Sequence, residues 1–86
     1  MTRYRVTAYF PEMPHLLFRV HRGSNCLMCV ENYAIAAART METNLKMKVG
    51  SARWKIERIE GVVNDWRIVA TSETVARKKV WHHVHT

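Results

Sequence analysis

One stretch of the sequence, residues 30–45 (VENYAIAAARTMETNL), carries a clear helical signature. Its apolar side chains recur at three- and four-residue spacing, as on a helix that packs on one side. They are Ala34, Ala37, Ala38, Met41 and Leu45. Alanine favours helix and allows a close approach to a sheet. The remaining segments mostly alternate with period two, so we expect strands that pack against this helix.

The start of the helix depends on residues 26–30 (CLMCV). They can form a short strand, or they can form the first turns of the helix with Ser24 or Asn25 as the N-cap. A helix from residue 24 to 45 would be about 33 Å long, which is more than a domain of this size normally needs. Asn32 is a good N-cap in its own right. We therefore predict a strand at residues 26–30 and a helix over about residues 32–46.

Two strands are predicted before this segment, because apolar and polar residues alternate. Residues 3–10 collect apolar side chains on one face, namely Tyr4, Val6, Ala8 and Phe10, and place Arg3, Arg5, Thr7 and Tyr9 on the other. Residues 16–21 repeat the pattern, with Leu16, Phe18 and Val20 on the inward face. The two prolines between them cannot continue a strand ladder.

Two further strands and a second helix are predicted after the long helix. Residues 52–60 form a strand in which the alternation slips between Ile56 and Ile59, so we expect a bulge there. Residues 66–71 alternate with Trp66, Ile68 and Ala70 inward. Ser72 is the expected N-cap of a helix over about residues 72–83.

The sequence thus predicts an α+β fold, a small antiparallel sheet of 4–5 strands with two helices packed on one face. The order is β-β-(β)-α-β-β-α. Because 86 residues suit one core, we expect residues 1–86 to form a single domain.

The charge balance points to acidic partners, since 14 Lys and Arg face 7 Asp and Glu for a formal net charge of +7. No apolar run approaches the ~18 residues of a membrane span, and no secretory signal is visible. Two cysteines make no disulfide framework. We expect a cytoplasmic protein that binds no membrane and carries reduced thiols.

Cys26 and Cys29 form a CxxC motif, which at a helix N-terminus would be typical of a thiol-redox pair. In a strand, the odd spacing would put the two sulfurs on opposite faces, so we expect buried structural cysteines. A zinc site shared with His82, His83 and His85 would need a wider histidine spacing than HHVH offers. We therefore predict no metal site and no cofactor.

No set of residues suggests catalysis. The serines lie where turns or helix caps want a hydroxyl, and the three glycines are scattered singly, unlike a phosphate-binding loop. We expect a protein that is not an enzyme.

Strand alternation gathers basic side chains and Tyr9 on the sheet face away from the helices, a surface of the kind that holds single-stranded nucleic acid. A second basic cluster falls on the last helix. The predicted binding residues are Arg3, Arg5, Tyr9, Arg19, His21, Lys55, Arg67, Arg77, Lys78 and Lys79.

The main functional hypothesis is a non-enzymatic module whose basic surface engages nucleic acid. The alternative is a small stoichiometric inhibitor or adaptor, as found in phages and mobile elements, that docks on and blocks a host protein or nucleoprotein complex, for example at an acidic surface. An edge strand, residues 3–10, offers a route to a partner's sheet or to a homodimer. The third hypothesis is a thiol-redox or zinc protein through Cys26 and Cys29.

Overall fold

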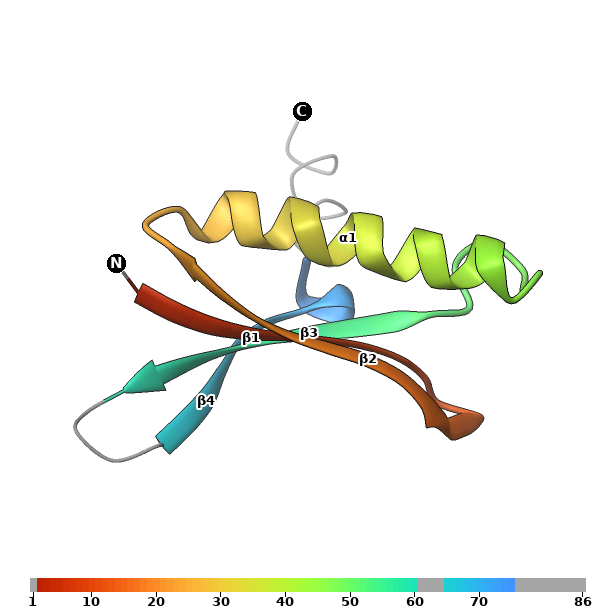
Figure 1. Cartoon of the computed structure of the whole chain (residues 1–86), viewed down its shortest axis with the longest axis horizontal. Coiled ribbons are helices and arrows are strands. Elements are labelled where there is room, and N and C mark those ends of the chain that lie inside the picture. Colours follow the sequence, from red (N-terminus) through yellow and green to blue (C-terminus); the bar gives the residue numbers. More distant parts are fainter. Residues whose placement is uncertain (1, 61–64, 76–86) are drawn as a thin grey trace.

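The computed structural model describes residues 2–60 and 65–75, which form a four-stranded antiparallel sheet with a long helix across one face (Figure 1). The elements are β1 (Thr2–Phe10), β2 (Met13–Ser24), α1 (Leu27–Asn44), β3 (Arg53–Glu60) and β4 (Asp65–Thr71). A second helix begins after β4, and its residues 72–75 are described. The predicted α+β class with two helices is confirmed, in the order β-β-α-β-β-α.

The strand order in the sheet is β2-β1-β3-β4. The expectation that residues 3–10 form an edge strand is wrong, because β1 pairs with β2 on one side and with β3 on the other. The edges of the described sheet are β2 and β4. Within the described residues, β2 is the longer of the two edge strands, and no strand pairs with its outer backbone groups.

The core lies between α1 and one face of the sheet. The predicted inward face of β1 is confirmed, since Val6 and Ala8 are fully buried and Tyr4 and Phe10 nearly so. The helix meets them with Val30, Ala34 and Ala38, which are four residues apart and buried. Small side chains on the helix allow a close approach to the sheet. The molecule is accordingly only 19 Å thick in its shortest dimension.

The predicted strand at residues 26–30 is wrong, because α1 begins at Leu27 and Cys26 is its N-cap. Val30 lies on the buried stripe of the helix and has no exposed surface. The helix is longer than expected because the sheet is large. The strand β2 alone has 12 residues, and the molecule extends 40 × 39 Å. A longer helix therefore has a sheet to cover. It ends at Asn44, near the expected end.

The faces of β4 are reversed over most of its length by an irregularity in its pairing with β3. Ile56 pairs with Ala70, but Glu57 pairs with Ile68, so Val69 is an extra residue on β4. A single inserted residue moves every following side chain to the other face. Trp66 and Ile68 were expected inward and are instead on the face away from α1; Ala70 alone of the three is buried in the core.

The second helix starts where the sequence predicts, but Ser72 is not its cap. The Thr71 hydroxyl accepts a hydrogen bond from the backbone N–H of Thr74 at 3.1 Å, which is the geometry of an N-cap. The Ser72 hydroxyl instead accepts a hydrogen bond from the Trp54 N–H on β3 at 3.4 Å.

Candidate functional site

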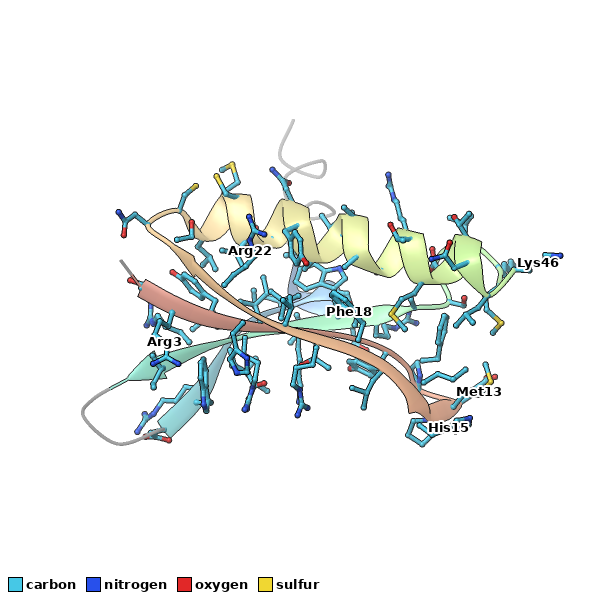
Figure 2. The ribbon with its side chains drawn as sticks, viewed as in Figure 1. Arg3, Met13, His15, Phe18, Arg22 and Lys46 are labelled. Atoms are coloured by element: carbon cyan, nitrogen blue, oxygen red, sulfur yellow. The ribbon has the colours of Figure 1, made fainter. Side chains whose placement is uncertain are left out.

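The sheet face opposite α1, called the open face below, carries most of the predicted binding residues. Paired residues of antiparallel strands share a face, and the pairing of Arg5 with His21 and with Glu57 fixes this one. The side chains assigned to it are Arg3, Arg5, Thr7, Tyr9, Leu17, Arg19, His21, Arg53, Lys55, Glu57, Ile59, Trp66 and Ile68. Figure 2 shows Arg3 on this side of the sheet, and Phe18 and Arg22 on the side of α1.

The centre of the open face is a cluster of Arg5, Glu57, Trp66 and His21, one from each strand. Arg5 binds Glu57 through two parallel hydrogen bonds, Nε to Oε1 at 3.1 Å and Nη2 to Oε2 at 2.8 Å. The Arg5 guanidinium also lies 4.8 Å from the centre of the Trp66 ring. The His21 ring is 5.4 Å from the same ring, tilted by 55°. Cation–π and aromatic contacts of this kind hold Trp66 against the sheet.

The ion pair changes the proton affinity of both partners. The hydrogen bonds from Arg5 hold the pKa of the Glu57 carboxyl below its usual range, against the opposing effect of burial. The same bonds raise the pKa of Arg5. Glu57 is therefore ionised at neutral pH and neutralises Arg5, so Arg5 acts as a support for Trp66 and less as a free cation.

Other cations border this cluster. Arg19 donates from Nε to the Thr7 hydroxyl at 3.2 Å and remains exposed at its end. Arg3 is exposed and Lys55 is half-buried. Thr7 is only 3% exposed although it belongs to the open face, because longer side chains cross over it. The open face thus combines a packed centre with positive charge around it.

The predicted binding residues do not all belong to this face. The structure assigns Arg3, Arg5, Tyr9, Arg19, His21 and Lys55 to it. Arg67 pairs with Arg58 and lies on the face of Tyr4, where it binds Asp65 at 3.3 Å. Arg77, Lys78 and Lys79, like His82, His83 and His85, lie outside the described residues.

Sequence reasoning missed Trp66 as a residue of the open face. The run of Trp66, Ile68, Val69 and Ala70 contains adjacent apolar residues, and that adjacency was the available signal of an extra residue in β4. A bulge was predicted in β3 between Ile56 and Ile59. The register shift does lie there, between Ile56 and Glu57, but the extra residue is Val69 of the partner strand β4.

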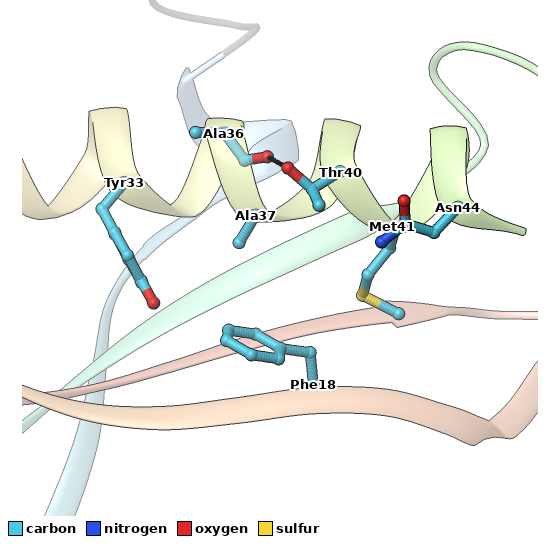
Figure 3. A pocket seen from close by; sticks show the side chains of 7 residues that line it. All are labelled: Phe18, Tyr33, Ala36, Ala37, Thr40, Met41 and Asn44. Carbon is cyan, nitrogen blue, oxygen red and sulfur yellow. Dashed lines mark hydrogen bonds between the residues drawn. The ribbon is translucent and has the colours of Figure 1, made fainter.

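A groove runs between α1 and β2 on the other side of the sheet (Figure 3). It has a volume of about 350 Å³. Its lining is mostly apolar and consists of Phe18, Tyr33, Ala36, Ala37, Thr40, Met41 and Asn44. The Arg22 guanidinium packs over the Tyr33 ring at 4.3 Å from its centre. The groove exists because α1 lies mainly over β1 and β3 and leaves Phe18 39% exposed.

The two cysteines share the N-terminus of α1, and both are exposed. The expectation of buried cysteines on opposite faces of a strand is therefore wrong. No group of three or more His, Cys, Asp and Glu side chains close enough to hold a metal is found in residues 2–60 and 65–75.

Comparison with protein-family models, with curated proteins and with solved structures finds no match for this chain. Within the described part of the chain, no helix has the length and apolar character needed to cross a membrane.

Proposed function

We propose that this protein is a non-enzymatic binding module that holds single-stranded nucleic acid on its open face. The observation that carries the proposal is the position of Trp66, on this face beside Arg5 and His21 and bordered by further cations. Sequence-tolerant binding of single strands combines a basic surface with aromatic rings on which bases stack. Tyr9 lies on the same face, so β1, β2 and β4 each supply one ring, those of Tyr9, His21 and Trp66.

The roles of the residues follow from their environments. Arg3, Arg19 and Lys55 are the phosphate ligands, since they lie on the open face around the cluster of Arg5, Glu57, Trp66 and His21. Trp66 and His21 are the stacking residues. Arg5, neutralised by Glu57, positions the Trp66 ring. The net charge of +7 adds a long-range attraction for any polyanion.

The test measures the affinity for labelled single-stranded and duplex DNA and RNA between 50 and 200 mM salt, about the range over which phosphate contacts weaken strongly. We expect binding that prefers single strands. Trp66→Ala is expected to weaken it about tenfold or more, the effect of losing one stacked base. Lys55→Gln is expected to lower the slope of log affinity against log salt by about 1.

Two matched controls make the test specific. Ile68→Ala changes another residue of β4 on the same face that has no ring and is 59% exposed. Lys48→Gln removes a charge from an exposed residue after α1, away from the open face. Absence of binding at 50 mM salt (about the low end of the useful range) would overturn the proposal, as would equal losses in Lys55→Gln and Lys48→Gln.

A second candidate is a small protein inhibitor or adaptor of the phage or mobile-element type. It is favoured by the free edge of β2 and the apolar groove beside it, since an extended peptide from a partner can pair with an edge and fill such a groove. Affinity capture from a nuclease-treated bacterial lysate separates the candidates. A stoichiometric partner retained by wild type but lost in Phe18→Ala would favour docking over nucleic-acid binding.

A further inference from the structure

Cys26 and Cys29 lie one turn apart at the start of α1, in a geometry that the nucleic-acid proposal does not use. Cys26 is the N-cap and has an extended backbone conformation (φ −128°, ψ 105°). Its Sγ accepts a hydrogen bond from the backbone N–H of Cys29 at 3.3 Å. Ordinary N-caps supply an oxygen at this position; here a sulfur takes its place.

The surroundings of the two sulfurs make them unequal. The hydrogen bond from the Cys29 thiol, and after it the Cys29 backbone N–H, lowers the pKa of the Cys26 thiol, while desolvation and then the charge of Glu31 act against this. The thiol–thiol hydrogen bond raises the pKa of Cys29. A thiolate at Cys26 also lies at the positive end of the helix dipole. Cys26 is therefore the better nucleophile at neutral pH, and Cys29 stays protonated.

Both thiols are accessible and near enough to be joined. The Cys26 Sγ already lies 3.3 Å from the backbone nitrogen of Cys29, so the two side chains start from the same end of the helix. Both cysteines are exposed, and Met28 between them is 69% exposed. An exposed apolar side chain beside a reactive thiol gives a bound disulfide compound a surface to contact.

We propose that Cys26 and Cys29 form a reversible dithiol–disulfide couple that exchanges with small anionic disulfides of the glutathione type. The Cys26 thiolate attacks one sulfur of the disulfide, the sulfur–sulfur bond breaks, and one thiolate leaves and takes up a proton. Cys29 then loses its proton and attacks the Cys26 sulfur, releasing the second thiol. The protein loses two electrons and two protons, and the disulfide becomes two thiols.

The choice of a small anionic disulfide follows from charge and from what the sequence lacks. Glutathione disulfide carries net negative charge, and the protein carries +7. Both prolines, Pro11 and Pro14, precede the cysteines, so the chain has no later proline loop to align a peptide against the thiols.

The test equilibrates the full-length reduced protein in anaerobic glutathione buffers of stepped ratio, quenches with acid, alkylates and weighs the products. Wild type is expected to become lighter by two hydrogen atoms, with no glutathione retained. Cys29→Ala is expected to accumulate a mixed disulfide at Cys26. Cys26→Ala is expected to react several-fold more slowly than Cys29→Ala. Because both side chains are exposed, both variants are expected to keep the wild-type circular dichroism spectrum.

Two outcomes would overturn the proposal. One is a wild-type protein that remains a dithiol or ends as glutathione adducts at oxidising ratios. The other is an equal rate of adduct formation in the two single variants, since the Cys29 backbone N–H and the helix dipole still act on the Cys26 sulfur in Cys29→Ala. The double variant Cys26→Ala/Cys29→Ala is expected to bind nucleic acid like wild type, so the two proposals stand or fall separately.

Discussion

Among single residues, Glu42 connects the end of α1 to the start of β3. It is 4% exposed although it is charged. Its Oε2 accepts hydrogen bonds from the backbone N–H groups of Gly50 at 2.8 Å and Ala52 at 2.9 Å. A carboxylate that is buried on a helix and satisfied by backbone donors fixes the connection that enters β3.

Replacing Glu42 with alanine is expected to destabilise the fold by about 2 kcal/mol, because two backbone donors lose their acceptor. Glu42→Gln keeps an acceptor oxygen at the same position and is expected to cost less. Urea denaturation followed by circular dichroism measures both. Equal losses in the two variants would mean that the hydrogen bonds to Gly50 and Ala52 are not the reason that Glu42 is buried.

The ion pair of Arg5 and Glu57 predicts a pH dependence of stability. The folded-state pKa of Glu57 is lowered by Arg5 from the ordinary value of 4.5. A lowered pKa contributes stability that is present above the unfolded value and is lost as the pH falls through the folded value. The free energy of unfolding of wild type minus that of Glu57→Gln is therefore expected to decrease below about pH 4.5 and to be constant between pH 6 and 7. A constant difference down to about pH 3 would contradict the lowered pKa.

At the scale of elements, α1 ends in a Schellman motif with a strained residue. The Met47 N–H binds the Glu42 carbonyl at 2.8 Å and the Lys46 N–H binds the Thr43 carbonyl at 3.2 Å. This motif needs a left-handed residue after the cap, and Lys46 has a φ of 54°. Glycine is the residue that adopts this conformation at little cost.

Lys46→Gly is therefore expected to stabilise the protein by about 0.5–1 kcal/mol. Lys46→Ala removes the same charge but keeps the Cβ, so it is the matched control and is expected to give no gain. Thermal unfolding monitored at a fixed buffer composition distinguishes them. If alanine stabilises as much as glycine, the gain comes from the lost charge and not from the backbone conformation.

The elements also show which parts of the fold the sequence could predict. The face of β1 was predictable, since four alternating apolar residues leave one register that buries them. The start of α1 was not, because its first turn contains no acidic residue and its cap is a cysteine, a residue that caps helices rarely. The face of β4 was not predictable either, because Trp66, Ile68, Val69 and Ala70 offer apolar side chains to both faces.

The residues of the candidate site likewise divide into those that the sequence could predict and those that it could not. The cations of β1 and β2 could be assigned to the open face by counting from Val6 and Val20, which lie opposite each other. The central stacking residue could not, since it depends on the extra residue Val69 and on a contact between Trp66 and His21 on the two outermost strands. Contacts across four strands arise from the curvature of the sheet and leave no local pattern in the sequence.

At the scale of the whole molecule, β2 is an edge of the sheet, and no strand among residues 2–60 and 65–75 pairs with its outer side. Two copies can pair there in antiparallel fashion about a two-fold axis. Centred on Phe18, this pairing sets Phe18 against its own copy and Leu16 against Val20, all on the side of α1. It also sets Leu17 against Arg19 on the open face. Centring on Arg19 would instead bring two like charges together, which is unfavourable.

We predict a homodimer through β2 that forms at physiological salt, where the repulsion between two basic copies is screened. In the dimer, Leu17→Lys places a new cation opposite Arg19 of the second copy, and the two-fold axis repeats this contact. The variant is therefore expected to be monomeric. Ile68→Lys makes the same apolar-to-Lys change on β4, at the other edge, and is expected to leave the dimer intact. Sedimentation velocity over a wide concentration range measures both. A monomeric wild type, or equal dissociation of the two variants, would show that β2 does not pair with a second copy.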